Sequence, residues 1–289
     1  MSTPIAQALA EGQQAGARYA LAAPRRSPQG SSGTQLSRSV GESLEFMDYR
    51  EYQPGDDLRR LDWAASARSD KLIVKLYRQE VCPHLDILLD GSRSMDLRGT
   101  QKGRAAVGLA SALAAAADNA GYSRRAYLTG QGCRPVSQAA EPPMFWTGVE
   151  LNSVEGPPQS LQALPPVWRP HGIRVFLSDL LWLGDPLELL RGIADRASAV
   201  YVIQVLAAAD AAPSHLGNFR LVDSETSEYE ELFLDATALA RYRNNLQRNR
   251  EDWYRAARQV GAVLVPLVAE EVCGAWDFSK LVEAGILTV

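Results

Sequence analysis

Cysteine and histidine are both scarce in this sequence, with three of each in a chain of 289 residues. The cysteines are Cys82, Cys133 and Cys273, and their odd number and wide spacing fit neither a disulfide framework nor a Cys-x-x-Cys zinc site. A reducing cytoplasm is therefore the expected setting. The few histidines give little support for a serine hydrolase triad.

Long apolar runs and an excess of either sign of charge are also missing. No run approaches the ~18 to 20 residues that a membrane-spanning helix needs, and residues 1–23 lack the basic start and unbroken apolar stretch of a signal peptide. Lys and Arg total 30 against 34 Asp and Glu, a formal net charge of −4, so nothing attracts the whole chain to nucleic acid or anionic lipid. We expect a soluble, cytoplasmic protein with no nucleic-acid partner and no membrane insertion, although a membrane-associated complex stays open.

Apolar strands alternate with helical segments along most of the chain. Short, nearly continuous apolar runs predict strands buried on both faces at residues 85–89, 173–177, 199–206 and 263–268. Alanine-rich or amphipathic segments predict helices between them at residues 99–120, 186–197 and 236–260. This order predicts an α/β fold with a doubly wound, mostly parallel sheet of Rossmann type.

The composition divides the chain into three parts. Residues 1–36 are predicted to form an N-terminal helix and a flexible linker, because residues 24–33 are rich in proline, serine and glycine. Residues 37–81 are predicted to form a small β-rich subdomain, whose last strand has apolar residues at alternate positions from 72 to 76. Residues 82–289 form the α/β domain in this prediction.

Acids and hydroxyls follow two of the predicted buried strands. Asp90, Ser92 and Ser94 come directly after one strand, and Asp179 comes after a later one. Because parallel strands end at the same edge of a sheet, these side chains are expected to converge there. They are hard oxygen ligands of the kind that Mg²⁺ or Mn²⁺ prefers. The competing interpretation is that they only cap the helices that follow.

The Asp90-x-Ser92-x-Ser94 motif, with Asp179 after a later strand, resembles the metal-ion-dependent adhesion site of von Willebrand factor type A domains. The resemblance covers about residues 83–268 and implies a von Willebrand factor A-like fold. In that family the hydroxyls bind a divalent cation directly, the acids act directly or through water, and an acidic group of a partner completes the octahedron. A loop threonine adds a third oxygen, for which this sequence offers Thr147, Ser153 and Ser160.

A second motif precedes this domain, between Tyr49 and Arg68. It contains Pro54-Gly55-Asp56-Asp57, Asp62-Trp63 and Ser66-Ala67-Arg68, and it closely resembles the signature of the bacterial domain-of-unknown-function family 58. From the residues alone, the motif is a turn leading to a capped helical turn, with internal pairing among Arg60, Asp62 and Arg68. As a partner-binding surface, its candidate residues are Tyr52, Asp56, Asp57, Arg60, Asp62, Trp63 and Arg68.

Proteins of this family are generally associated with MoxR-type AAA+ ATPases, so the resemblance implies help in assembling, activating or loading metal into other proteins. We therefore predict a non-enzymatic adaptor. It would bind an acidic group of a protein client or of the ATPase through Mg²⁺ or Mn²⁺ at Asp90, Ser92, Ser94 and Asp179.

Enzyme mechanisms find less support in the sequence. A haloacid-dehalogenase-like phosphatase would need a second aspartate in place of Ser92, and residues 99–103 lack the Walker A spacing. Two alternatives stay open. One is a metal-dependent hydrolase that activates water with Asp90 and Asp179. The other is a protein that has lost the metal and binds through the surface between Tyr49 and Arg68 alone.

Overall fold

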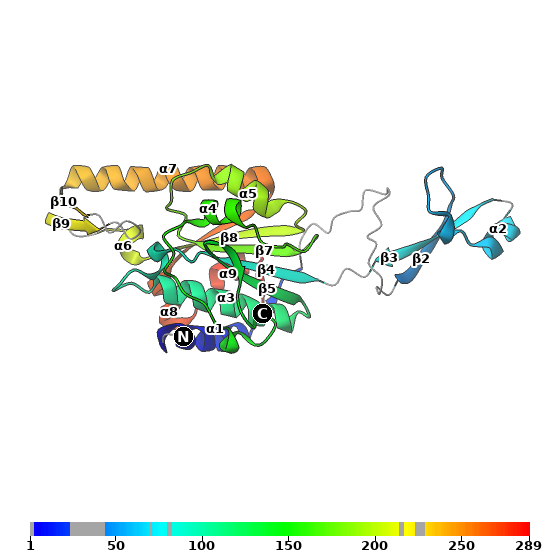
Figure 1. Cartoon of the computed structure of the whole chain (residues 1–289), viewed down its shortest axis with the longest axis horizontal. Helices are drawn as coiled ribbons and strands as arrows, with labels where there is room; N and C mark the ends of the chain where they lie inside the picture. Colours follow the sequence, from blue (N-terminus) through cyan, green and yellow to red (C-terminus); the bar gives the residue numbers. More distant parts are fainter. Residues whose placement is uncertain (1–2, 24–43, 70, 80–82, 214–216, 223–228) are drawn as a thin grey trace. The chain divides into compact units, whose positions relative to one another are not determined.

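The computed structural model describes residues 3–23, 44–69, 71–79, 83–213, 217–222 and 229–289. The chain divides into two compact units, and Figure 1 shows the elements of each. The larger unit contains Met1–Ser27 and Pro83–Val289, and the smaller one contains Pro28–Cys82.

A six-stranded sheet forms the centre of the larger unit, in the order β11-β8-β7-β4-β5-β6. Five strands run parallel and β6 is antiparallel to β5. The strands are β4 (His84–Leu89), β5 (Ser123–Gly130), β6 (Gly132–Pro135), β7 (Ile173–Ser178), β8 (Ala199–Leu206) and β11 (Val263–Val268). Every residue of β4 and β7 is buried, which explains their continuous apolar runs. The prediction of a mixed α/β fold with a mostly parallel sheet is confirmed.

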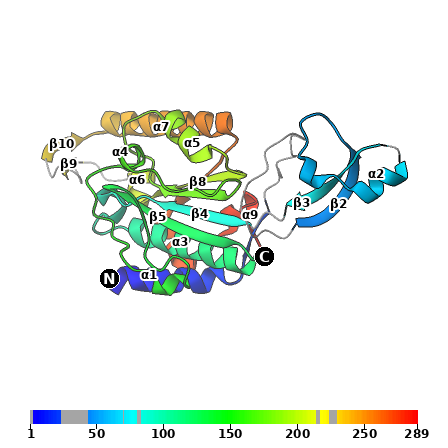
Figure 2. The same ribbon diagram turned by 45° about the vertical axis from the view of Figure 1, so that its right-hand side comes forward.

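Helices cover both faces of this sheet (Figures 1 and 2). On one face, Ile87 and Leu89 belong to the same apolar core as α1 (Thr3–Gly16), α3 (Lys102–Asn119), α8 (Ala269–Ala275) and α9 (Ser279–Glu283). On the other face, Leu88 and Phe176 share a core with α4 (Pro157–Ala163), α5 (Pro186–Ala194) and α7 (Ala236–Val260). Successive residues of β4 thus face opposite layers, as the pleat of a strand requires.

Helix α1 is part of the larger unit, although the sequence analysis set residues 1–36 apart. Its Ala8 and Leu9 are fully buried. A Cβ atom on Gly12 would lie 2.1 Å from the carbonyl oxygen of Gly108, so glycine allows α1 to approach α3 very closely. The helix ends at Gly16, and the chain then forms β1 (Ala20–Leu21), which pairs with β12 (Leu287–Thr288).

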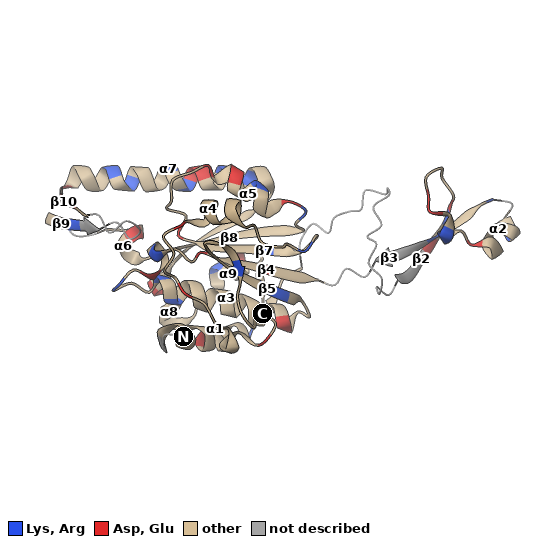
Figure 3. Ribbon diagram, viewed as in Figure 1, with Lys and Arg blue, Asp and Glu red and all other residues tan. Residues whose placement is uncertain are grey.

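The remaining elements of the larger unit are short, apart from α7. Strands β9 (Gly217–Val222) and β10 (Tyr229–Leu234) pair antiparallel. Arginines recur along α7 (Figure 3), whose Leu246, Trp253 and Ala257 are buried. The short helices are η2 (Arg93–Asp96), η3 (Pro143–Phe145) and α6 (Ala208–Ala211). No helix in the described ranges has the length and apolar character to span a bilayer.

The smaller unit is built on one antiparallel pair of strands, β2 (Leu44–Glu51) and β3 (Ile73–Gln79). The chain between them forms η1 (Leu58–Arg60) and α2 (Trp63–Ser69). Asp57 caps η1, because its side chain accepts a hydrogen bond from the backbone N–H of Arg59 at 3.0 Å. The linker predicted around residues 24–36 lies outside the described residues.

Candidate functional site

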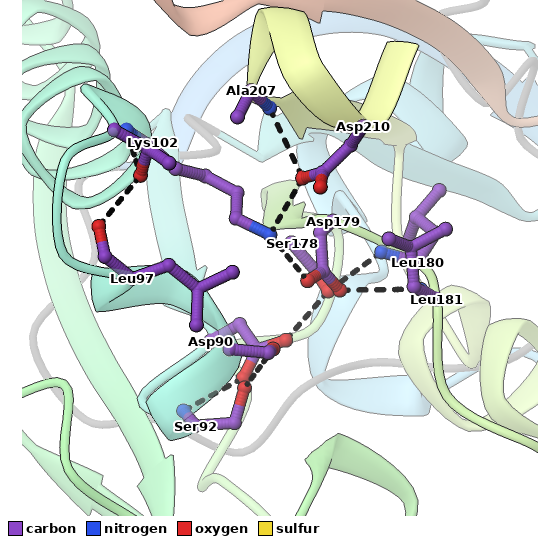
Figure 4. A network of polar contacts seen from close by, with 12 residues as sticks. Asp90, Ser92, Leu97, Lys102, Ser178, Asp179, Leu180, Leu181, Ala207 and Asp210 are labelled. Carbon is purple, nitrogen blue, oxygen red and sulfur yellow. Dashed lines mark hydrogen bonds and ion pairs between the residues drawn. The ribbon is translucent and has the colours of Figure 1, made fainter. Parts of the chain in front are cut away.

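The carboxyl ends of β4 and β7 lie side by side in the sheet. Leu89 pairs with Leu177 in the parallel register, so Asp90 and Asp179 emerge at the same edge. Both side chains are buried. Figure 4 shows the polar network that surrounds them. We call this group the strand-end cluster and define it as Asp90, Ser92, Ser94, Lys102, Thr129, Ser178, Asp179 and Asp210.

Asp90 lies fully buried among hydroxyl and backbone donors. Its Oδ1 accepts hydrogen bonds from the Ser92 backbone N–H at 3.0 Å and from Thr129 Oγ1 at 3.4 Å, and its Oδ2 accepts one from Ser178 Oγ at 2.6 Å. Burial and then the nearby Asp179 carboxylate raise the pKa of Asp90 to about 6, although the hydrogen bonds from Ser178 and Ser92 oppose this. Within the described residues, no ion pair involves Asp90.

The interpretation of these side chains as helix caps is wrong for Ser92 and Asp179. Ser92 is at the N-cap position of η2 but makes no capping bond, and its Oγ lies 3.1 Å from Ser94 Oγ instead. The N-cap of α5 is Asp185 rather than Asp179. The hydroxyls of Ser92 and Ser94 therefore remain available at the edge of the sheet.

The hydroxyls proposed from residues 147–160 occupy three different settings. Ser153 lies beside Ser92 in an isolated parallel bridge, and its backbone N–H donates to the Gly91 carbonyl at 2.9 Å. Ser160 Oγ donates to the carbonyl oxygens of Gly130 and Gly156, which is a structural role. Thr147 pairs through its backbone with Ser137, away from these contacts. Of the three, the structure brings only Ser153 next to the Asp90 motif.

Thr129 is a member of the cluster that the sequence analysis missed. Besides its contact with Asp90, its Oγ1 accepts a hydrogen bond from the Gly91 backbone N–H at 3.0 Å. Leu89 pairs with Leu128 in the parallel register of β4 and β5, so Thr129 follows at the same level as Asp90. The available signal was a polar residue directly after the apolar run Ala126-Tyr127-Leu128.

Lys102 and Asp210 were also missed, and they give the cluster its single ammonium group and a third carboxylate. Lys102 is in the first turn of α3, with only 1% of its side chain exposed. Its Nζ donates to Asp179 Oδ2 at 3.0 Å and to Asp210 Oδ2 at 3.1 Å (Figure 4). Burial alone would lower the pKa of Lys102, but the Asp179 and Asp210 carboxylates raise it above its ordinary value, so the ammonium stays charged.

In the smaller unit, most acids of the signature motif have structural partners. Asp62 Oδ1 caps α2 by accepting from the backbone N–H groups of Ala64 and Ala65, and its Oδ2 pairs with Lys75 Nζ at 3.1 Å. These contacts, led by the Ala65 N–H, lower the pKa of Asp62 to about 2. Asp56 pairs with Arg50 at 2.7 Å. The motif thus folds as the predicted turn and capped helix.

The predicted internal pairing of Asp62 with Arg68 is wrong. Arg68 Nε donates to the Ala64 carbonyl at 3.1 Å, whereas Asp62 takes Lys75 as its cation. The side chain of Arg60 lies outside what the structure describes. Trp63 is 70% exposed, and Tyr52 is partly exposed with its backbone N–H bonded to the Leu72 carbonyl. Among the described residues of this motif, Trp63 is therefore the most exposed large apolar side chain, ahead of Leu58 and Tyr49.

The fold and the cluster define an α/β protein that has a mostly parallel sheet and an acid and hydroxyl site at its carboxyl edge. Residues 48–254 match the family model described as protein of unknown function DUF58, and the chain belongs to this family. Uncharacterized protein Mb1516 of Mycobacterium bovis and uncharacterized protein Rv1480 of Mycobacterium tuberculosis are each 28% identical to it over 249 residues, which is 81% of this chain and 78% of theirs.

Two solved structures are also similar in part. One is the conserved hypothetical protein BatB from Bacteroides thetaiotaomicron, with 14% identity and a TM-score of 0.38 over 70% of this chain and 98% of that one. The other is an aerotolerance-related membrane protein from Bacteroides fragilis, with 12% identity and a TM-score of 0.37 over 71% and 96% of the two chains.

Proposed function

We propose that this protein is a non-enzymatic interaction module with a von Willebrand factor A-like domain, which captures an acidic group of a partner through a divalent cation at the strand-end cluster. The observation that supports this most is the buried carboxylate of Asp90, which faces hydroxyl groups and takes part in no ion pair among the described residues. A buried carboxylate without a cation is costly unless something else supplies the charge.

The charges of the cluster favour a divalent ion. Three carboxylates, Asp90, Asp179 and Asp210, face the single ammonium of Lys102, so the cluster has a formal charge of −2 when all four are ionised. Mg²⁺ or Mn²⁺ would neutralise it, and hydroxyl and carboxylate oxygens are the ligands that these ions prefer. Asp90, Ser92, Ser94 and Asp179 would hold the ion, and the hydroxyls of Thr129 and Ser178, which donate to Asp90, lie beside them.

This ligand set is poor in carboxylates, and that matters for the proposed role. No group of three or more His, Cys, Asp or Glu side chains among the described residues is arranged as a metal site, so an ion here would rely on serine hydroxyls and water. Mg²⁺ held by few protein oxygens keeps several waters, which an incoming carboxylate can replace. An ion bound in this way supplies a point of attachment for an acidic side chain.

Exposed apolar side chains lie in the chain segments that flank the cluster. Leu181 and Leu183 follow Asp179, and Leu183 is 96% exposed. Val154 follows Ser153, whose backbone pairs with Ser92, and it is also exposed. A partner that presents an acidic residue between apolar ones would match these features, because burying Leu183 and Val154 adds apolar contact around the polar attachment.

The resemblance to the family signature suggests who such partners are. We propose a MoxR-type AAA+ ATPase and a protein client, with the present chain linking the two during assembly, activation or metal insertion. Nucleotide hydrolysis would belong to the ATPase, because the chain has no Walker A sequence.

One observation favours a second candidate, a metal-dependent hydrolase. The pKa of Asp90, raised to about 6, is near the range in which a carboxylate serves as a general base at neutral pH. This candidate predicts that a panel of phosphate esters is hydrolysed with Mg²⁺ and that Asp179→Asn abolishes the activity. A panel without turnover rejects it.

The experiment that tests the leading proposal is a pull-down from the native cell, with Mg²⁺ or with chelator. We expect one set of captured proteins to be lost with chelator and also lost in Ser92→Ala/Ser94→Ala. Trp63→Ala is the matched control, because Trp63 is exposed in the smaller unit. Capture that ignores chelator and the serine variant but fails in Trp63→Ala would overturn the proposal in favour of binding through the signature surface.

A further inference from the structure

We propose that Lys102 is a resident cation of the strand-end cluster, which shares Asp179 with the divalent ion and thereby keeps that ion weakly bound and exchangeable. This inference rests on the proposed function and deepens it. It starts from the finding that a buried lysine ammonium binds one carboxylate oxygen of Asp179, the second acid of the motif (Figure 4).

The ammonium of Lys102 is fixed from two sides. Asp179 holds it from the end of β7, and Asp210 holds it from α6. Asp210 is itself restrained, because its Oδ2 accepts from the Ala207 backbone N–H at 3.3 Å and its carbonyl accepts from Tyr242 Oη at 2.7 Å. With 1% of its side chain exposed, Lys102 has no route to solvent without rearrangement of these elements. The ammonium is therefore a permanent part of the site.

This arrangement makes the two acids of the motif unequal. Both oxygens of Asp179 are engaged, Oδ2 with Lys102 Nζ and Oδ1 with the Leu181 backbone N–H at 3.1 Å. Asp90 accepts only from neutral donors. Asp90 would therefore attract a divalent ion. At Asp179 the same ion would meet a carboxylate that Lys102 already neutralises, and the fixed ammonium of Lys102 would repel it. Like charges in a buried site repel strongly, so the ion binds less tightly than the carboxylate count implies.

A pair of substitutions separates the effect of Lys102 from the effect of total charge. Lys102→Met combined with Asp210→Asn removes one positive and one negative group, so the formal charge of the cluster stays at −2, as in the wild type. The only electrostatic change is that Asp179 loses its ammonium partner. Asp210→Asn alone has the opposite effect on Asp179. The ammonium of Lys102 then pairs with Asp179 alone, and the formal negative charge of the cluster decreases.

The experiment is calorimetric titration of the full chain with MgCl₂, together with the thermal shift that Mg²⁺ produces. We expect the double variant to bind Mg²⁺ at least tenfold more tightly than the wild type and to show the larger thermal shift. Asp210→Asn should bind at least tenfold more weakly. Lys102→Arg keeps the charge and should remain within a few-fold of the wild type. Circular dichroism checks that each variant is folded.

The outcomes distinguish this inference from the proposed function. If the wild type binds Mg²⁺ and the double variant binds no more tightly, Lys102 is only structural and the inference fails, whereas the cation site stands. If only the double variant binds, Lys102 replaces the ion and the proposed cation-mediated function fails. If neither binds, both fail. Should the double variant not fold, Asp210→Asn decides, because binding as tight as the wild type would overturn the inference.

Discussion

Ser178 Oγ donates a 2.6 Å hydrogen bond to Asp90 Oδ2, and this bond ties the last residue of β7 to the first residue after β4. Asp90 is thereby held in a fully buried position beside Asp179. The bond stabilises the ionised form of Asp90, but it does not compensate for burial and the neighbouring negative charge.

Asp90 should make the protein less stable as the pH rises through the acid range. Its folded pKa of about 6 is above its ordinary value of 3.8, so the folded state binds more protons between these two values, and stability falls as pH rises through that window. The shift corresponds to about 3 kcal/mol. Denaturant unfolding of the wild type and Asp90→Asn without metal, from pH 3.5 to 7, should show this loss only in the wild type. Parallel pH profiles would contradict the assignment.

Lys102→Met should destabilise the larger unit strongly. The variant leaves Asp179 and Asp210 without their shared ammonium, and breaking a buried ion pair in this way costs about 3 to 5 kcal/mol. Lys280→Met is the matched control, because Lys280 pairs with Glu271 at an exposed position and such pairs contribute about 0 to 1 kcal/mol. Urea unfolding measures both. Equal losses in the two variants would mean that burial of Lys102 has no energetic consequence.

Two glycines in helices differ in the space that a methyl group would find, so replacing each with alanine should have opposite effects on stability. Gly12→Ala should cost about 1 to 3 kcal/mol, because the new Cβ would lie 2.1 Å from the Gly108 carbonyl oxygen and the helices must separate. Gly192→Ala in α5 should instead stabilise by about 0.5 to 1 kcal/mol, because it meets no atom within 4 Å and alanine favours a helix. Thermal unfolding of the two variants gives the comparison, and a loss in both would reject this explanation.

The sheet was predictable from the sequence, but much of the cluster was not. Continuous apolar runs identify the buried strands, and residues directly after those strands, such as Asp90, are found by their position alone. Lys102 was missed because nothing in the helical pattern of residues 99–120 distinguishes it from an exposed lysine. It stands at the very start of α3, and the two acids that hold it come from distant parts of the chain.

Asp210 and Thr129 illustrate two other limits. Asp210 is on α6, which has four residues and leaves no periodic signal in the sequence. Thr129 depends on the register between β4 and β5, and register is a property of the paired strands rather than of either strand alone. Ser153 was among the predicted hydroxyls because the motif needs a third oxygen, and its proximity to Ser92 comes from a single bridge between two irregular segments.

In the smaller unit, Asp62 should titrate far below an ordinary aspartate. The Ala65 backbone N–H, and then Lys75, stabilise its ionised form and lower its pKa to about 2. Its contribution to stability is therefore present above pH 4 and is lost as the pH falls toward 2. Carboxyl NMR should give a midpoint near 2 for Asp62 in the wild type and a higher one in Lys75→Met. A midpoint unchanged by Lys75→Met would contradict a role of Lys75 and would leave the capping bonds and the Tyr49 hydroxyl as the cause.

Thr129→Val should weaken Mg²⁺ binding at the strand-end cluster without unfolding the protein. Valine has nearly the shape of threonine, but it removes the hydroxyl that donates to Asp90 Oδ1 at 3.4 Å and accepts from the Gly91 N–H at 3.0 Å. The Gly91 N–H then has no partner, and an unsatisfied buried donor costs about 1 to 3 kcal/mol. Since the loop from Asp90 to Ser94 loses this anchor and the ion loses a nearby oxygen, we expect at least a tenfold lower affinity by calorimetry.

Thr147→Val, an exposed position outside the cluster, is the matched control and should bind Mg²⁺ as the wild type does. Equal affinities in the two variants would show that the Thr129 hydroxyl contributes neither to the ion nor to the geometry of the loop that holds it.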